Sequence, residues 1–559
     1  MATSDAKNPT ARELLEPNYL DVDELLDDLE KDVLVQATGL FGRASLKSSP
    51  IEPEKRKIAL SISGGGAGGA YSAGALETLL GRMRKRGIPV DILVGTSAGA
   101  LNSYGVFLEE LGLSNPQLND DPHLRQPYST FIASIWSYLD RHRRSSRWVV
   151  GRRAWMIDVA TRGLNTPLRQ WGVGVLLILL VIVLNPFLFV SIVMFSGLEN
   201  LLPDTVVAWI RQGDHVHHLA LLGLLSLAGL ACAIAFTIRT FGESLFRDTP
   251  ILSFLANTGP KGDLTVPLRW PREQTEDRAR VLSRDIVAEW YARRDQYPEL
   301  IITATDITLG EECLFTLVQP DTYHKLAANN WLTVQLDSRT DTSKRYRERD
   351  DALFTLSENL LHCIVGSAAV PSAFPAQEIG IYGGGRKEVR HRFVDGGVLN
   401  NSPVHLAIDA GATHIITLEL EPMEEAKPLA KNDKGRRYNL IEAGVTTFTT
   451  LLRRAIDKDI RRTVTWNRFL FDHPESLEPP KWSKNTPRHD KRVIHLYRVA
   501  PAQREIGTVD FDGHYAKGKQ VISLRDVLRR GVVDLQGKHI WRATLQHSPH
   551  ATRSKPNAS

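Results

Sequence analysis

Residues 57–105 read KIALSISGGGAGGAYSAGALETLLGRMRKRGIPVDILVGTSAGALNSYG. Short apolar runs alternate in this stretch with helical patterns. Lys57–Ser63 and Val90–Val94 are predicted strands, and Gly69–Arg86 is a predicted helix that ends in basic residues before Gly87. A second helix is expected directly after the second strand. Strands that alternate with helices predict a layered α/β fold with a central, mostly parallel sheet.

The loop SGGGAGGA (63–70) spells G-x-G-x-x-G through Gly64, Gly66 and Gly69, the pattern of a dinucleotide-binding loop. Such a site needs an acidic residue at the end of the second strand, about twenty residues further on, to bind the ribose. Asp91 lies near that spacing but at the start of the strand, and the loop contains no lysine. The loop is therefore interpreted as a set of backbone amides that converge on a different anion.

The stretch ILVGTSAGALNS (92–103) contains a G-x-S-x-G motif centred on Ser97, between Gly95 and Gly99. The motif follows a predicted strand and opens a predicted helix, which is the context of a nucleophile elbow. A sharp turn there presents the serine hydroxyl, while the first amides of the helix lie close to a developing oxyanion. Adjacent parallel strands would bring this elbow and the glycine loop to the same edge of the sheet.

A serine nucleophile needs a base that accepts its proton. The histidines that follow Ser97 include His362, His391, His405 and His414. None lies in a loop typical of catalysis, and a structural or surface role is favoured for each. Asp395, in FVDGGVLNNSPV, lies at a predicted strand end before Gly396 and Gly397, so that it could approach a second loop. A simple Asp-Gly turn is the alternative interpretation.

Composition limits the classes of function. The 559 residues are 42% hydrophobic, as in globular proteins, and are enough for several domains. A net charge of +5 is small for this length and does not favour a nucleic-acid partner. Three widely separated cysteines indicate a reducing compartment rather than a disulfide framework. The polar N-terminus lacks the apolar core of a signal peptide.

Two apolar runs predict a membrane hairpin. Residues 171–198 and 219–238 contain no ionisable side chain, apart from the cysteine in the second run, and each is long enough to cross a bilayer. Eight arginines precede the first run, between Arg141 and Arg169, whereas the connecting loop 199–218 carries only one. The positive-inside rule therefore places the loop outside and both flanks in the cytoplasm. Three histidines in that loop are interpreted as an interfacial polar cluster and not as a metal site.

Four motifs occur in the order SGGGAGGAYSAGAL, GTSAGALN, GSAAVPSAFPA and VDGGVLNNSPV. In this order they resemble the patatin-like phospholipases, over roughly residues 57–420, and the chain is similar to a bacterial-type member with an inserted transmembrane hairpin. The resemblance implies an α/β fold and a Ser–Asp dyad without a catalytic histidine. It implies no cofactor and no metal.

Carried over by position, Ser97 resembles the nucleophile and Asp395 the general base. Gly64, Gly65 and Gly66 resemble the oxyanion loop. The remaining motif positions are Gly69, Gly95, Gly99, Gly396 and Gly397. Gly68 departs from the family pattern, which usually has Arg or Lys there. The departure leaves the backbone donors in place but removes a nearby cation.

The implied protein is a membrane-bound lipid acyl hydrolase with a membrane lipid as substrate and the bilayer as partner. It would have two spans, about 171–197 and 218–239, and a cytoplasmic catalytic domain and termini, in a bacterial inner membrane. A carboxylate base with an ordinary pKa predicts loss of activity near pH 4, and a histidine base predicts loss near about 6.5.

The expected segments, in chain order, are an acidic, flexible extension (1–55), the first patatin-like part (56–140), a basic juxtamembrane segment (141–170), the transmembrane hairpin (171–240), the second patatin-like part (241–420), a C-terminal α/β extension (421–545) and a disordered tail (546–559). Within the first segment, YLDVDELLDDLEKDVL predicts a docked amphipathic helix with Leu25, Leu26, Leu29 and Val33 on one face. Residues 351–368 predict another helix.

Three other functions stay open at this stage. A non-catalytic membrane scaffold could keep the fold without hydrolysis, and Gly68 is the feature that favours it. An α/β-hydrolase-type esterase would use a Ser-His-Asp triad. A dinucleotide-binding oxidoreductase is the third.

Overall fold

The computed structural model describes residues 18–30, 33–40, 43–50, 56–115, 130–141, 204–205, 208, 248–262, 272–337, 352–371, 374–383, 388–400, 403–420, 458–473, 493–501, 516–517, 520–521 and 523–546. One compact unit comprises residues 1–146, 248–371 and 376–559, and a second comprises 147–247 and 372–375. All elements discussed below belong to the first unit.

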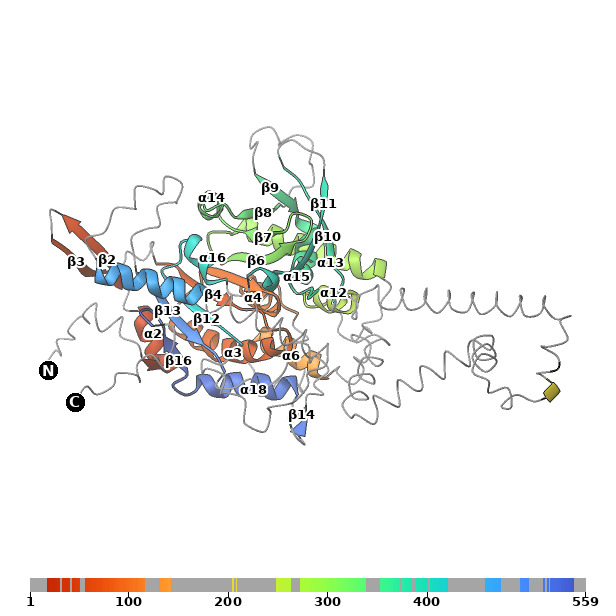
Figure 1. Cartoon of the computed structure of the whole chain (residues 1–559), viewed down its shortest axis with the longest axis horizontal. Coiled ribbons are helices and arrows are strands. Elements are labelled where there is room, and N and C mark those ends of the chain that lie inside the picture. Colours follow the sequence, from red (N-terminus) through yellow and green to blue (C-terminus); the bar gives the residue numbers. More distant parts are fainter. Residues whose placement is uncertain are drawn as a thin grey trace. The chain divides into compact units, whose positions relative to one another are not determined.

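A 12-stranded sheet forms the centre of the first unit, with its elements labelled in Figure 1. Its main path is β1-β16-β13-β12-β4-β5-β6-β7-β8-β9, and β11 pairs with both β6 and β10. The strands are β1 (Tyr19–Leu20), β4 (Ile58–Ile62), β5 (Ile92–Thr96), β6 (Glu299–Asp306), β7 (Glu311–Leu317), β8 (Leu332–Asp337), β9 (Leu353–Leu356), β10 (Gln377–Ile381), β11 (Val389–Asp395), β12 (His414–Leu418), β13 (His495–Val499) and β16 (Ile540–Arg542).

The five central strands, β13, β12, β4, β5 and β6, run parallel to one another. Every residue of these strands is buried, as expected for parallel strands that are covered on both faces. The α/β fold with a mostly parallel central sheet is therefore confirmed.

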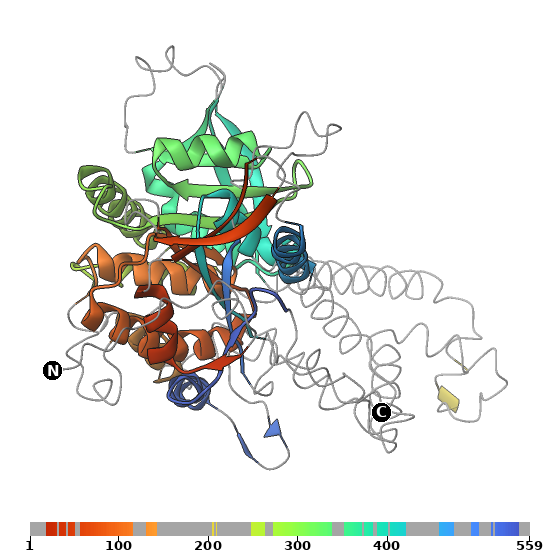
Figure 2. The same cartoon turned by 90° about the vertical axis from the view of Figure 1, so that its left-hand side faces the viewer.

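Helices cover both faces of the sheet. The larger hydrophobic cluster packs one face against α2 (Val22–Glu30), α3 (Gly69–Arg86), α4 (Ala98–Glu110), α6 (Phe131–Arg141), α12 (Thr249–Ala256), α13 (Arg272–Ala292), α15 (Leu360–Ser367) and α18 (Leu524–Leu535). The smaller cluster packs the other face against α14 (Pro320–Ala328), α16 (Val404–Asp409) and a helix over 458–472. α3 and α18 lie side by side in both views (Figure 1 and Figure 2).

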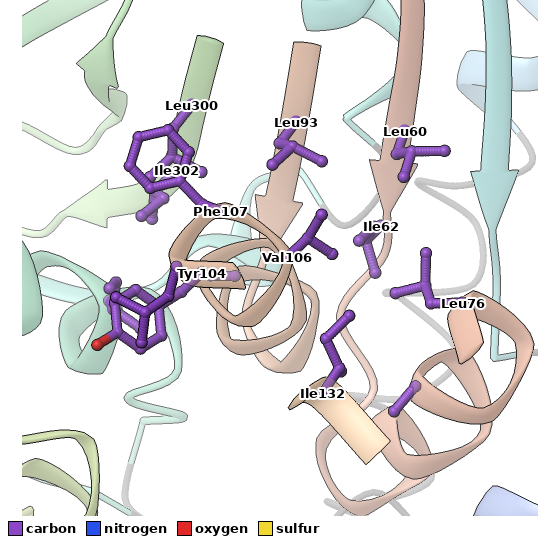
Figure 3. Close-up of a cluster of buried hydrophobic side chains, with 14 of the residues drawn as sticks. Leu60, Ile62, Leu76, Leu93, Tyr104, Val106, Phe107, Ile132, Leu300 and Ile302 are labelled. Carbon is purple, nitrogen blue, oxygen red and sulfur yellow. The ribbon is translucent and has the colours of Figure 1, made fainter. Parts of the chain in front are cut away.

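α4 is the helix that fixes the region around Ser97. Its Val106 and Phe107 face Leu60, Leu93 and Leu300, which come from three neighbouring strands (Figure 3). All five side chains are fully buried. Burying a side chain of this size stabilises a fold by roughly 1.5–3 kcal/mol, so the helix that follows Ser97 is anchored along its length to the sheet.

Local patterns were correct for most elements and wrong for two. Residues 351–368 do not form one helix, because Leu353–Leu356 joins the sheet as β9 and α15 begins only at Leu360. In the N-terminal segment Leu25, Leu26 and Leu29 are buried, as expected for a docked helix. That helix ends at Glu30, and Val33 instead begins β2 (Val33–Leu40), which pairs with β3 (Arg43–Pro50).

Within the described part of the chain, no helix combines the length and the apolar character that a membrane crossing requires. Both predicted spans, 171–197 and 218–239, and the three histidines between them lie outside the described residues. Most of the predicted tail, 547–559, also lies outside them.

Candidate active site

The sheet brings two strand ends together head-on. The first part of β6 pairs with β5 as far as Thr96, which lies opposite Thr303. From the next residue on, the same edge of β6 pairs with β11, whose last residue, Asp395, lies opposite Ala304. β11 runs antiparallel to β6 and therefore points toward the end of β5. This arrangement places Asp395 against the residue that follows β5, which is Ser97.

Ser97 lies in a strained turn between β5 and α4. Its φ of 56° and ψ of −123° are rare for a residue with a side chain, and such strain is typical of functional turns. The neighbouring glycines are required by close contacts. A Cβ atom on Gly95 would lie 2.5 Å from the carbonyl oxygen of Gly99, and one on Gly99 would lie 2.0 Å from the carbonyl oxygen of Ile62. The geometry matches the predicted elbow.

Ser97 and Asp395 are joined by a short hydrogen bond. The Ser97 hydroxyl donates to Oδ2 of Asp395 at 2.5 Å, and the amide of Gly397 donates to Oδ1 at 2.7 Å. Both side chains are buried. The backbone of Asp395 is held as well, since its amide donates to Ala369 and its carbonyl oxygen accepts from Thr305. The carboxylate is thus aimed at the serine with little freedom to turn away.

Burial raises the pKa of the Asp395 carboxyl from its ordinary value near 3.8 to about 7, although the hydrogen bonds from Ser97 and Gly397 act in the opposite direction. The expectation of an ordinary carboxylate that titrates near pH 4 does not hold for this structure, because removal from water disfavours the charged form. A base with a pKa near the working pH is well matched to proton transfer.

The glycine loop follows β4, the neighbour of β5, and lies against the elbow. The amides of Gly65 and Gly66 donate to no acceptor within the described ranges, and Gly66 has a φ of 58° that favours glycine. The loop continues into the short helix η2 (Gly66–Gly68) and then α3. A Cβ atom on Gly69 would lie 2.8 Å from that of Ala98, so the starts of α3 and α4 are in contact.

Gly68 has room for a side chain to begin. Its φ is −61°, and an added Cβ would lie 3.4 Å from the nearest atom, Cδ1 of Leu420. By contrast, an added Cβ on Gly65 would lie 2.2 Å from the same atom. The backbone geometry of the loop therefore does not depend on a glycine at position 68, whereas Leu420 packs closely on Gly65.

Three side chains that the sequence did not single out support this site. The hydroxyl of Ser367, at the end of α15, accepts a hydrogen bond from the amide of Ser97 at 3.0 Å. Asn102 donates to the carbonyl oxygen of Gly69 at 2.9 Å and accepts from the indole of Trp136 at 2.7 Å. Asn102 and Trp136 are buried. Ser367 follows Gly366 in the third quoted motif, which is the only sequence signal for it.

The downstream histidines have other contacts. His362 contacts Gln377 at 3.4 Å, His391 contacts Asp306 at 2.6 Å, and His414 contacts Thr413 at 2.9 Å. His405 lies in α16. In the part of the chain that the structure describes, Ser97 makes no hydrogen bond to a histidine.

Asp91 lies at the opposite end of the strand from Ser97. Its carboxylate accepts a hydrogen bond from the amide of Ile58 at 2.7 Å and so joins β4 to the segment before β5. Among the described residues, no group of three or more His, Cys, Asp or Glu side chains is arranged to hold a metal ion.

Comparisons with known proteins point to one family. The family model described as patatin-like phospholipase matches residues 60–176 and 238–408, just over half of the chain, and leaves 177–237 unmatched. No curated protein sequence matches the chain. Among solved structures, the chain is similar to VipD from Legionella pneumophila at 13% identity, over 91% of this chain and 70% of that one. The TM-score is 0.26, which is too low to support an inference about fold.

Proposed function

Because the chain belongs to the patatin-like phospholipase family, we propose that it hydrolyses fatty-acyl esters of membrane lipids, with Ser97 as the nucleophile and Asp395 as the general base. The observation that carries this proposal is the hydrogen bond of 2.5 Å between the Ser97 hydroxyl and the Asp395 carboxylate. The strained backbone of Ser97 supports it further.

The first half of the reaction forms an acyl-enzyme. As Ser97 Oγ attacks the ester carbonyl carbon, its proton passes to Oδ2 of Asp395 and the carbonyl oxygen becomes negative. The bond to the lipid alcohol then breaks, and the Asp395 carboxyl returns the proton to the leaving oxygen. In the second half, water attacks the acyl carbon and gives its proton to Asp395. The bond to Ser97 Oγ breaks, the serine is reprotonated and the fatty acid leaves.

The glycine loop would stabilise the negative oxygen. We assign this role to the amides of Gly65 and Gly66, which have no acceptor among the described residues, and to the first amides of α4, with Gly64 as the third residue of the proposed oxyanion loop. The amide of Ser97 donates to Ser367 and is therefore not counted among these donors. Loss of one such donor costs about 10²–10³-fold in kcat in serine hydrolases.

Release of fatty acid from phospholipid vesicles by the full-length chain tests this function. We expect hydrolysis by the wild-type chain and none above background by Ser97→Ala, since removal of a serine nucleophile costs about 10⁶-fold. Equal hydrolysis by the two proteins would mean that a contaminant or another residue is responsible. If neither releases fatty acid from a panel of lipids, a non-catalytic scaffold becomes the better description.

Residues 171–240, which include the unmatched stretch 177–237, are proposed to be a transmembrane hairpin inserted into the family fold. Two observations support it: the gap in the family match falls on the two uncharged runs, and an arginine-rich segment precedes the first of them. Ser97 precedes the runs and Asp395 follows them, yet the two side chains are in contact. The number of crossings between them is therefore even, and two spans satisfy this condition.

In this proposal the catalytic domain and both termini are cytoplasmic, and the protein resides in a bacterial inner membrane. A reporter enzyme fused within 199–218 is expected to be active only on the external side, whereas the same reporter after residue 546 should be active only in the cytoplasm. A cytoplasmic signal from the 199–218 fusion would contradict the hairpin.

A further inference from the structure

Two turns connected to β11 present aliphatic side chains to solvent: one contacts Arg392 in this strand, and the other follows Asp395 at its end. Ile307 and Leu309, in the turn between β6 and β7, are each 52% exposed. Val398 and Leu399, three and four residues after Asp395, are 40% and 48% exposed. Turn residues at such positions are commonly polar, and grouped exposed aliphatic side chains mark interaction surfaces. These four residues are called the rim below.

Hydrogen bonds hold the first turn in place. Oδ1 of Asp306 accepts from the amides of Thr308 and Leu309 at 2.8 and 3.3 Å, and the amide of Gly310 donates to the carbonyl oxygen of Asp306. The amide of Ile307 donates to the carbonyl oxygen of Arg392 in β11. The exposed side chains of this turn are therefore presented by a defined backbone next to the strand that carries Asp395.

The second turn is joined to the same edge of the sheet. The amides of Leu399 and Asn400 donate to the carbonyl oxygen of Gly396. The side chain of Asn400 donates to Glu312 at 3.2 Å, and Glu312 is the second residue of β7, directly after the first turn. This contact joins the segment that follows Leu399 to the start of β7, where the first turn ends.

Arg392 supplies an exposed positive charge next to the first turn of the rim. Arg392, whose backbone contacts Ile307, has a side chain that is 68% exposed. Its Nε lies 3.9 Å from the carboxylate of Glu378, which is itself exposed. An exposed ion pair of this kind contributes little to the free energy of folding. Burial raises the pKa of the Glu312 carboxyl to about 8, so this acid carries little negative charge at neutral pH. The exposed acid Glu311 is the remaining anion at the start of β7.

We propose that the rim of Ile307, Leu309, Val398 and Leu399 inserts into the surface of a phospholipid layer, with Arg392 against the lipid phosphates. The rim then delivers lipid from the layer to Ser97. This inference rests on the proposed function, which supplies the reason for a lipid surface beside Asp395. Aliphatic side chains gain free energy when they leave water for the acyl region, without requiring a specific lipid.

Activity on a vesicle substrate and on a soluble ester distinguishes loss of contact with the lipid surface from loss of catalysis. The double variant Leu309→Asp/Leu399→Asp is compared with Val281→Asp/Val533→Asp, which changes equally exposed valines on α13 and α18. Hydrolysis of phosphatidylglycerol vesicles by the rim variant is expected to fall at least about tenfold, while hydrolysis of a soluble short-chain ester stays within about twofold. The control variant should keep both activities. Equal losses on both substrates, or no loss on vesicles, would overturn the proposal.

A second readout does not depend on hydrolysis. In a chain with Cys232 replaced by serine, Leu309→Cys carries an environment-sensitive fluorophore, and Val533→Cys carries the same probe as the control. After reconstitution into vesicles, brominated lipids are expected to quench the probe at position 309 at least about threefold more than at 533, because bromine quenches only at close range. Equal quenching at positions 309 and 533 would overturn the proposal that the rim inserts into lipid, even if the enzyme is active. Strong quenching at 309 in a chain that releases no fatty acid would retain the rim and refute the hydrolase.

Discussion

Asp395→Asn is expected to lower kcat by about 10³–10⁴-fold, because the amide keeps the shape of the carboxylate but cannot accept the Ser97 proton. The loss should appear in kcat and in kcat/KM alike, since the missing proton transfer belongs to the transition state. Steady-state kinetics on a soluble ester measure both quantities without interference from the lipid surface.

Asp91→Asn is the matched control for this substitution. Asp91 is also an aspartate whose pKa burial raises, and its carboxylate accepts from Ile58, a bond that an asparagine oxygen can keep. It lies at the far end of β5 from Ser97, so its activity should stay within about threefold of wild type. Individual alanine variants of His362, His391, His405 and His414 should also retain activity. A collapse of kcat in any one of them, or wild-type activity in Asp395→Asn, would contradict a carboxylate base.

Asp395→Asn is also expected to make the protein more stable than wild type at pH 8. The folded-state pKa of Asp395 is about 7, above the value near 3.9 of an unfolded chain. The folded state therefore binds more protons between these two values, and the free energy of unfolding of the wild type falls as pH rises through that window. The wild type loses stability because its buried carboxyl has to ionise as the pH rises, whereas the asparagine of the variant does not ionise.

The expected difference is about 2 kcal/mol at pH 8. Three pKa units set an upper limit near 4 kcal/mol, and part of it is lost because the NH2 group of asparagine replaces an oxygen that accepts a hydrogen bond. It should shrink toward zero near pH 4. Thermal unfolding of both proteins at several pH values measures it, and titration of Glu312 and Asp459 cancels in the difference. A variant that is equally or less stable at pH 8 would mean that Asp395 is not held as a costly buried anion.

The pH dependence of activity is a weaker test of the general base. The wild-type activity should rise with pH and level off above about 7. A histidine base with an ordinary pKa near 6.5 would give almost the same curve, so the pH profile of activity alone does not distinguish the two. The stability difference at pH 8 reports on the buried Asp395 carboxyl itself, because a histidine with the same pKa in the folded and unfolded states adds no pH dependence to stability.

Local sequence patterns were sufficient to predict helices, strands and turns whose determining residues lie within a few positions of one another. The bounds of α3 are those predicted, because Gly87 adopts the left-handed conformation that ends a helix. The elbow was predictable from Gly95, Ser97 and Gly99, since only glycine fits at the two flanking positions. The second strand was placed two residues early, as β5 begins at Ile92 and not at Val90.

Features that depend on distant contacts were not predictable in this way. Residues 353–356 form a strand that pairs with β8 on one side and with Tyr382 on the other. Asp395 reaches Ser97 through the pairing of β11 with β6, about ninety residues away in the chain, a relation that the motifs imply only through the family. Its raised pKa depends on burial by the whole fold. Ser367, Asn102 and Trp136 act through individual hydrogen bonds, two of them made by Asn102, that leave no periodic pattern in the sequence.

Covalent labelling with a fluorophosphonate tests the central proposal most directly. The reagent forms a phosphorus–oxygen bond to an activated serine hydroxyl with loss of fluoride, and peptide mass spectrometry locates the adduct. The predicted result is a single adduct on Ser97 in the wild type and in Asp91→Asn, with labelling at least about 10³-fold slower in Asp395→Asn. An adduct on a different serine, or an unchanged labelling rate in Asp395→Asn, would contradict the proposed roles of Ser97 and Asp395.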